Sequence, residues 1–154
     1  MPKRAVPVIR ICFVIAKASK LYVVSAFQSG YGGYGYAEVQ SELSGIDTNA
    51  AELGSSIRCA LSNYYVSARI ETEKSTDVLD ELGKGRRTQF IRHAMQVAVT
   101  QSESGKYVNE GFFAYKGTGF DGLAGCMNSA PKGCSDEELG ALVVSLFSKI
   151  ERIK

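Results

Sequence analysis

The chain has 154 residues, of which 45% are hydrophobic and 22% charged, and its 18 Lys and Arg against 16 Asp and Glu give a formal net charge of +2. This composition excludes a disordered, collagen-like or coiled-coil protein, and the length is enough for one hydrophobic core. The near balance of charge selects neither a polyanionic nor a polycationic partner. The apolar stretch 5–16 contains Pro7 and Arg10 and is too short to span a bilayer, so we expect a soluble protein.

Two short runs near the start of the chain have the composition of strands. Residues 5–16 and 21–27 are rich in Val, Ile, Tyr and Phe, which favour extended structure. We divide the chain into 1–20, an N-terminal extension or first strand, and 21–154, a single α+β domain. The basic start and the apolar stretch after it also have features of a secretory signal peptide. Because Arg10 interrupts that stretch, we favour a cytoplasmic protein.

A segment rich in glycine and tyrosine follows at 29–35. Four of its seven residues are glycine, so we expect a loop. Gly30–Gly35 satisfies the G-x-G-x-x-G pattern of dinucleotide sites, but neither a helix at the loop nor a second strand at the required distance is indicated. We expect the three tyrosines in this segment and directly after it to be exposed on one flexible loop, which either folds back as a lid over the core or forms an anchor for another protein. The three tyrosines are Tyr31, Tyr34 and Tyr36.

Two amphipathic helices have readable starts. Asn49 and Ser135 are favourable N-caps, and a glutamate stands three residues after each, as in a capping box. Both helices place Glu, Leu and Gly three, four and five residues after the N-cap. The glycines, Gly54 and Gly140, lie at the edge of each apolar stripe, where we expect a neighbouring backbone to approach closely. The agreement indicates either two related β-then-helix units or a chance likeness of two helices.

The middle of the chain is more polar. Apolar residues at 78, 79 and 82 predict a short amphipathic turn, which Gly83 could end in a left-handed cap. Acidic residues gather here and form either a face for a basic partner or a solvated surface: Glu71, Glu73, Asp77, Asp80 and Glu81.

The second half predicts a hairpin. Apolar residues alternate from Met95 to Val99, Ser104-Gly105 offers a turn, and a β-like run follows at 107–115. Phe112 and Phe113 cannot both face inward on a regular strand, so a helix or a partner should cover one of them. We expect a loop or short helix over 117–132, which contains Phe120. The resulting fold class is α+β, a largely antiparallel sheet with the two amphipathic helices on one face.

Few residues suggest catalysis. His93 is the only histidine, and its neighbour Arg92 favours a surface role over that of a general base. The four cysteines lack zinc-site spacing, so we expect no metal and no cofactor, with packing thiols or a Cys126–Cys134 disulfide as alternatives. A small RNA-binding or nucleotide-binding domain is the alternative to a protein-binding one. Its phosphate contacts would come from Lys84, Arg86, Arg87 and Arg92.

The order of these features resembles the small immunity proteins of bacterial contact-dependent growth inhibition systems. The Leu21–Gly35 strand and loop and the Glu52-Leu53-Gly54 helix are similar to the front half of such proteins. The rest of the resemblance lies in apolar and glycine patterns and in the start of the last helix, and it covers most of Leu21–Lys154. Its residues are Phe90, Ala94, Val97, Val99, Tyr107, Tyr115, Gly119, Phe120, Leu123 and Ser135-Asp136-Glu137-Glu138-Leu139-Gly140.

The resemblance implies a non-enzymatic protein that binds the toxic C-terminal domain of a matching effector in the bacterial cytoplasm and blocks it. Such families carry no catalytic motif, so the candidate partner-binding residues come from the exposed aromatics and the acidic segment described above. They are Tyr31, Tyr34, Tyr36, Phe112, Phe120, Glu73, Asp77 and Asp80.

Overall fold

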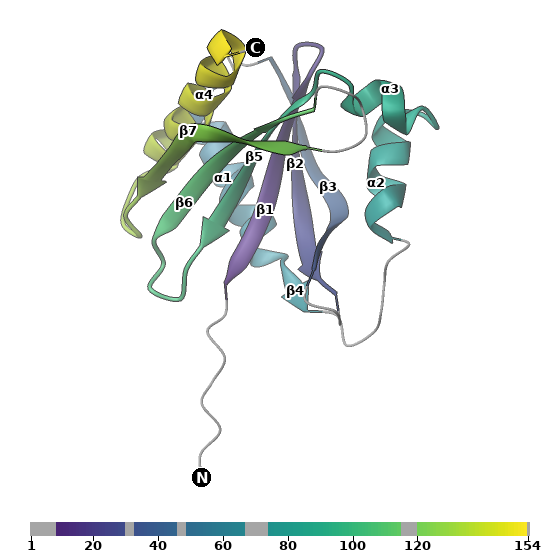
Figure 1. Ribbon diagram of the computed structural model, residues 1–154. Coiled ribbons are helices and arrows are strands. Elements are labelled where there is room, and N and C mark those ends of the chain that lie inside the picture. The colour runs from purple at the N-terminus through teal and green to yellow at the C-terminus, as the bar shows by residue number, and fades with distance from the viewer. Residues whose placement is uncertain (1–8, 30–32, 46–48, 67–73, 115–119, 154) are drawn as a thin grey trace.

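The computed structural model describes residues 9–29, 33–45, 49–66, 74–114 and 120–153. It confirms the predicted α+β class: a seven-stranded, mainly antiparallel sheet carries helices on its faces (Figure 1). The two long helices, α1 (Ala50–Ser62) and α4 (Asp136–Ile153), pack on one face, as the amphipathic patterns predict. Two short helices, α2 (Lys74–Leu82) and α3 (Arg87–Ile91), lie on the other face.

The sheet has the strand order β3-β2-β1-β5-β6-β7, and each neighbouring pair is antiparallel. The short β4 lies off this path and pairs in parallel with the end of β2. The strands are β1 (Arg10–Lys17), β2 (Lys20–Gln28), β3 (Tyr34–Ser44), β4 (Tyr65–Val66), β5 (Met95–Gln101), β6 (Tyr107–Phe113) and β7 (Asp121–Ala130).

The strand order is symmetric about the centre of the sheet. Strands β1 to β3 followed by α1 form one half, and β5 to β7 followed by α4 form the other. The halves meet where β1 and β5 run antiparallel, with Val14 opposite Val97. This arrangement agrees with the predicted pair of β-then-helix units. Helices α2 and α3 are inserted between the halves.

The expectation of a loop or short helix over 117–132 is wrong for 121–130, which form β7. This strand contains no Val, Ile or aromatic residue, so the usual local signal is missing. It forms because it pairs with β6, where Met127 lies opposite Glu110, and because Cys126 and Ala130 are buried beneath the helices. Long-range pairing here overrides weak local preference.

Both predicted helix starts are confirmed. The Asn49 side-chain oxygen accepts hydrogen bonds from the backbone N–H groups of Ala51 at 2.9 Å and Glu52 at 3.3 Å. The Ser135 hydroxyl accepts one from the backbone N–H of Glu138 at 3.1 Å. These bonds satisfy donors that the first turn of a helix leaves unpaired.

The predicted close approach at the two glycines is also confirmed, and it is reciprocal. A Cβ atom at Gly54 would overlap the backbone carbonyl of Asp136, and one at Gly140 would overlap the backbone carbonyl of Ala50. Each glycine therefore accommodates the first turn of the other helix. The shared position of the two glycines in the sequence reflects this mutual contact between α1 and α4.

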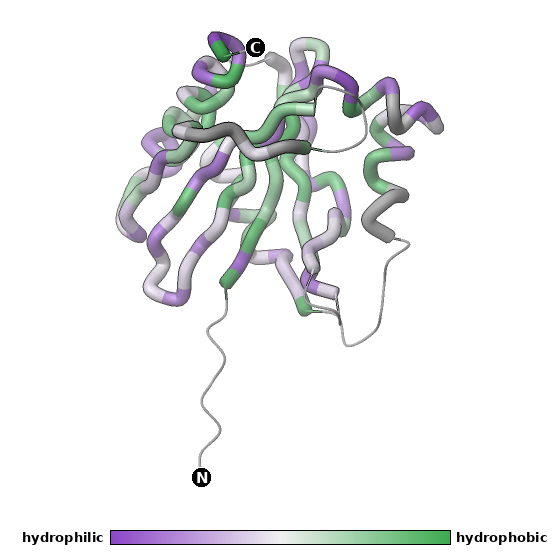
Figure 2. Tube along the Cα trace, viewed as in Figure 1, coloured by the Kyte–Doolittle hydropathy of each residue, from purple (hydrophilic) through white to green (hydrophobic). Residues whose placement is uncertain are grey.

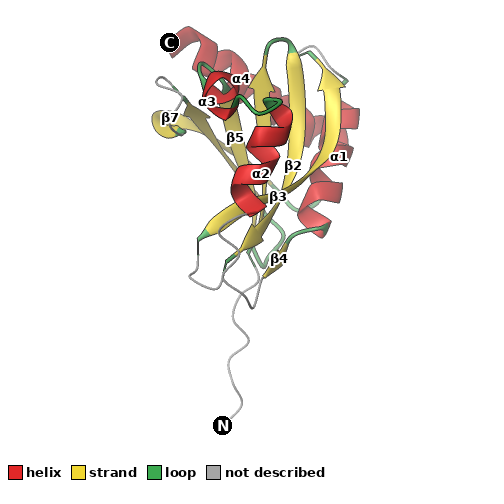
Figure 3. Ribbon diagram, turned by 90° about the vertical axis from the view of Figure 1, so that its right-hand side faces the viewer, coloured by secondary structure: helices red, strands yellow, loops and turns green. Residues whose placement is uncertain are grey.

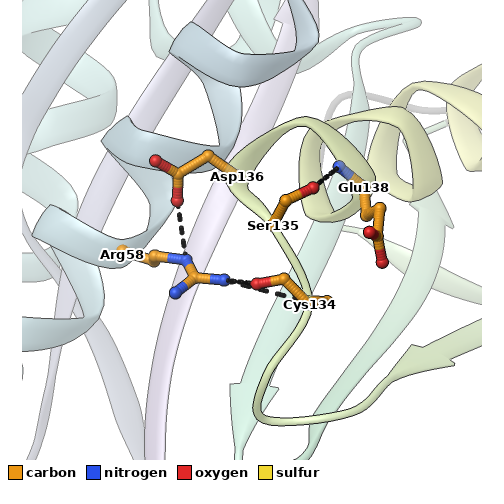
Figure 4. Close-up of polar contacts among 5 residues, drawn as sticks. All are labelled: Arg58, Cys134, Ser135, Asp136 and Glu138. Carbon is orange, nitrogen blue, oxygen red and sulfur yellow. Dashed lines mark hydrogen bonds and ion pairs between the residues drawn. The ribbon is translucent and has the colours of Figure 1, made fainter.

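A polar cluster joins α1 to the start of α4 (Figure 4). Arg58 Nε lies 2.8 Å from Asp136 Oδ1, and an Arg58 Nη2 group donates to the backbone carbonyl of Cys134. The guanidinium carbon also lies 5.5 Å from the centre of the Tyr107 ring. Arg58 thereby fixes the segment that leads from β7 into α4.

The main core lies between the sheet and the two long helices. The central strands are largely hydrophobic, whereas the helices alternate hydrophobic and hydrophilic positions (Figure 2). Cys12, Cys126 and Cys134 are buried free thiols that serve as packing residues, and Cys59 is an exposed free thiol. The core includes Val14, Leu21, Val23, Leu53, Ile57, Val97, Val99, Phe113, Leu139, Val143, Leu146, Phe147 and Ile150.

A smaller core lies on the opposite face, where α2 and α3 cover part of the sheet (Figure 3). Its helix residues include Leu79 and Phe90, which pack with Ile15 of β1. The predicted left-handed cap at Gly83 is displaced: positive φ angles occur instead at Lys84 and Gly85, with values of 52° and 82°. A Cβ at Gly83 would lie 2.9 Å from the Phe90 Cβ, so this glycine permits α3 to fold back against α2.

Candidate functional site

A groove of about 410 Å³ lies on the sheet face opposite α1 and α4, beside the short helices. Its walls come from the strands β1, β3, β5 and β6, from one residue of each short helix, and from the residue before β7. They are Ile11, Phe13, Tyr34, Tyr36, Leu79, Ile91, Gln96, Ala98, Thr100, Glu110, Phe112 and Phe120. Four of the eight candidate contact residues thus share one concave surface.

The alternation of β6 places Glu110 and Phe112 in the groove. Successive side chains of a strand point to opposite faces, and in β6 the residues Tyr107, Asn109 and Phe113 are buried beneath the long helices. Phe112 is half-buried on the groove side while Phe113 is 2% exposed in the main core. The structure therefore covers one of the two adjacent phenylalanines with helices, as the sequence analysis expects.

The floor of the groove is a small side chain between two larger ones. In the strand register Phe13 lies opposite Ala98, and Ala98 lies opposite Glu110. Neighbouring positions on one face of a sheet are close enough for their side chains to interact. Ala98 is 7% exposed, and Phe13 and Phe112 pack on the small cluster that contains it. Because its side chain is only a methyl group, it forms a low floor of the groove between Phe13 and Glu110.

Tyr36 forms a fixed wall. Its hydroxyl donates to Oε1 of Gln96 at 2.6 Å, and its ring meets the Phe13 ring edge to face, with centroids 4.9 Å apart. Gln96 is 4% exposed, so water hardly reaches its amide oxygen, and the Tyr36 hydroxyl supplies the hydrogen-bond donor that this buried oxygen needs. Two contacts therefore hold the orientation of Tyr36.

The prediction of a flexible loop carrying three tyrosines is wrong for two of them. Tyr34 and Tyr36 belong to β3, paired with Gln28 and Ala26 of β2. Tyr34 is 49% exposed at the rim of the groove, with its ring centroid 6.5 Å from that of Tyr64. The third, Tyr31, lies outside the described residues. Pairing with β2 orders the end of the glycine-rich segment into a strand.

The acidic candidates do not join this groove in the part of the chain that the structure describes. Asp80 is half-buried on α2 and does not line the groove, to which α2 contributes Leu79. Asp77 belongs to the same helix, but its side chain is not among those that the structure describes. Glu73 lies outside the described residues. The prediction of an acidic contact surface therefore stays a prediction.

Two of the four basic candidates lie at a second groove, of about 400 Å³, between the β1–β2 turn and the short helices, and Arg92 is not among its lining residues. Lys84 and Arg86 line it together with Lys17 and Lys20. Both strand lysines are engaged: Lys20 Nζ lies 2.8 Å from Glu42 Oε1, and Lys17 donates to the backbone carbonyl of Arg92. The side chain of Arg87 lies outside the described ones.

His93 is exposed in a turn, with a φ angle of 60°. Its ring centroid lies 6.2 Å from that of Phe113, and no carboxylate forms an ion pair with it among the residues that the structure describes. Those residues also contain no cluster of three or more potential metal ligands. None of their helices is both long enough and apolar enough to cross a bilayer.

Sequence reasoning did not single out Gln96, Ala98 or Glu110. A signal was present for Glu110, because the period of two in the predicted second hairpin strand puts it on the same face as Phe112. Ala98 gave no such signal. Its role depends on the small size of its side chain relative to Phe13 and Glu110, which lie beside it on the two neighbouring strands.

No protein-family model matches the chain, and no curated protein does either. Solved structures share its fold, among them the following two. A protein of unknown function from Neisseria meningitidis has 15% sequence identity and a TM-score of 0.73, with 92% of this chain and 94% of that chain covered. A chain of the CdiA-CT/CdiI toxin and immunity complex from Yersinia pseudotuberculosis has 14% identity and a TM-score of 0.69, with 93% and 98% covered. At these identities the likeness is one of fold.

Proposed function

We propose that this chain is a non-enzymatic immunity protein, which binds the C-terminal toxin domain of its cognate contact-dependent growth inhibition effector in the bacterial cytoplasm and blocks it. The observation that carries the proposal is the likeness of fold to a chain of the Yersinia pseudotuberculosis toxin and immunity complex, over 93% of this chain. The resemblance in sequence agrees with it, through the apolar pattern and the capped last helix.

The groove supports a binding role. Aromatic side chains often dominate the energy of protein interfaces, since each buries a large area while few torsions are fixed. Tyr36, Phe112 and Phe120 are all half-buried around the groove, so part of each ring remains available to a partner. Strands hold Tyr36 and Phe112 in place before binding, which lowers the entropic cost of association.

Neutralisation needs only a stable complex. A protein that covers the active site or substrate-binding surface of a toxin blocks it without a chemical step, and the strength of the block follows the affinity. The proposal therefore requires a partner surface that fits this chain, and it requires no catalytic residue here.

The test is protection of cells. The toxin domain encoded beside this chain is expressed from an inducible promoter, with or without the chain, and growth is followed. We expect growth arrest by the toxin alone, recovery when this chain is present, and a stoichiometric complex on size-exclusion chromatography of the purified pair.

Two controls make the test decisive. A noncognate toxin domain should arrest growth even when this chain is present, because recognition depends on specific contacts. Expression of this chain by itself should leave growth unchanged. Growth arrest by this chain alone, or absence of both protection and complex formation with the adjacent toxin, contradicts the proposal.

A further inference from the structure

Glu110 is a carboxylate in a groove that is lined largely by aromatic and aliphatic side chains. It lies in the groove with Phe13, Tyr36 and Phe112, and it is half-buried. The ion pairs among the described residues are Lys20–Glu42 and Arg58–Asp136, so within that part of the chain no cation neutralises Glu110. A partly dehydrated carboxylate without a cation is unfavourable, and binding a positive charge would relieve this cost.

We propose that the groove receives an arginine side chain of the protein partner, with its guanidinium bound to Glu110 and stacked against the aromatic walls. This inference rests on the proposed function, whose partner it describes chemically. The aromatic faces attract a cation through their ring quadrupoles. The carboxylate supplies the opposite charge at the end of the same space.

Arginine fits this site better than lysine does. Its guanidinium is flat, can donate two parallel hydrogen bonds to one carboxylate, and stacks on aromatic rings. In the groove, Phe13 and Glu110 flank Ala98 from the two neighbouring strands, so the aromatic and the carboxylate contact come from opposite sides. A lysine ammonium is more strongly hydrated and makes point contacts, so it would lose more water for less contact area.

The strand register makes the site rigid. Glu110 and Ala98 belong to β6 and β5, interior strands that are paired along their length. Tyr36 is fixed by its bond to Gln96 and its contact with Phe13. A site formed before binding recognises its ligand at low entropic cost.

A small probe tests the site directly. We titrate the full chain with N-acetyl-arginine amide and follow backbone signals by two-dimensional NMR. We expect saturable shifts centred on 96–98 and 108–112, weaker binding of N-acetyl-lysine amide, and at least about tenfold weaker binding of the uncharged isostere N-acetyl-citrulline amide.

Two variants act on the site by different routes. Glu110→Gln removes the charge while the shape is kept, and Ala98→Leu fills the floor while the charge is kept. We expect each to reduce binding of the arginine probe at least about tenfold. Glu110→Gln should unfold at the same temperature as the wild type or a higher one, since it removes an unpaired carboxylate. Glu38→Gln, an exposed carboxylate of edge strand β3, is the matched control and should bind as the wild type does.

Equal binding of arginine and citrulline probes, tighter binding of the lysine probe, or undiminished binding by Glu110→Gln overturns the inference. The growth assay separates it from the proposed function. If the wild-type chain protects cells and Glu110→Gln protects equally at limiting expression, the function stands and the arginine site falls. If the arginine probe binds at Glu110 but the chain neither protects cells nor binds the toxin, the site stands and the proposed function falls.

Discussion

Phe112 and Phe113 are adjacent in β6 yet serve different surfaces. Phe113 is 2% exposed in the main core, so we predict that Phe113→Ala lowers the free energy of unfolding by about 3–5 kcal/mol. Phe112 is half-buried at the groove, and Phe112→Ala should cost about 1 kcal/mol, because solvent already reaches its ring. Urea unfolding measures both values. Equal losses from the two substitutions would contradict the assignment of the rings to opposite faces.

Cys12 provides a prediction of pH dependence. Burial raises the pKa of its thiol above the ordinary value of 9.0, since a buried thiolate would lose its hydration. In the unfolded chain the thiol ionises near that ordinary value, while in the folded chain it stays protonated. Its stabilising contribution is therefore complete below about pH 8 and declines above about pH 9, by up to about 1.4 kcal/mol per pH unit.

We expect the free energy of unfolding to fall between about pH 8 and 10, and to fall less steeply in Cys12→Ala. Urea titrations at several pH values measure the two slopes, and Cys59→Ala serves as the control because that thiol is exposed. Parallel slopes for the wild type and Cys12→Ala would show that Cys12 does ionise in the folded state.

The residues of the groove divide according to how far sequence could predict them. Tyr34, Tyr36, Phe112 and Phe120 stand out in the sequence as aromatics expected at the surface, and the structure gathers them around one groove, with Tyr34 exposed and the other three half-buried. The binding role proposed for Glu110 depends on its neighbours in space. Among these, Phe13 and Ala98 lie on β1 and β5, which pair with each other across a long sequence separation. A residue whose environment comes from distant segments carries no local sign of its role.

At the scale of elements, the contact between α1 and α4 gives the sharpest stability prediction. A methyl group at Gly140 would overlap the backbone carbonyl of Ala50, which cannot move without displacing α1. We predict that Gly140→Ala lowers the free energy of unfolding by about 3 kcal/mol, at the upper end of the cost of overpacking, although alanine favours helix more than glycine does.

Gly133→Ala is the matched control for that substitution, because no atom lies within 4 Å of a Cβ built there. Its effect should be within about 0.5 kcal/mol of zero. Thermal and urea unfolding followed by circular dichroism compare the two variants. Stabilisation by Gly140→Ala would mean that helix preference, and not interhelical distance, governs this position.

Elements with local signals were predictable, and those without them were not. The caps at Asn49 and Ser135 act within one helical turn, so sequence alone located both long helices. β7 lacks strand-favouring residues and depends on pairing with β6. The five-residue α3 is too short for its apolar period to be recognised, and it is held by packing of Phe90 and Ile91 on the sheet.

At the scale of the whole molecule, the two halves form one continuous structure. β1 pairs with β5 at the centre of the sheet, and α1 packs on α4 across the same boundary. The repeated spacing of the helices hinted at two similar units, but no local pattern shows which strands meet between them. Each long helix packs on the strands of its own half, and the halves are joined by the β1–β5 pairing and by the contact between α1 and α4.

This joining predicts a single cooperative transition on unfolding. Removing either half would leave the edge of β1 or β5 unpaired and would expose the face of α1 or α4 that packs on the other helix, so a state with one folded half should carry a large penalty. Urea unfolding followed by circular dichroism and by amide hydrogen exchange should therefore give the same free energy for core amides of β1 and of β5. Two separate transitions, or exchange of β1 amides through a markedly cheaper opening than β5 amides, would contradict the single core, because amides in independent halves would report two different free energies.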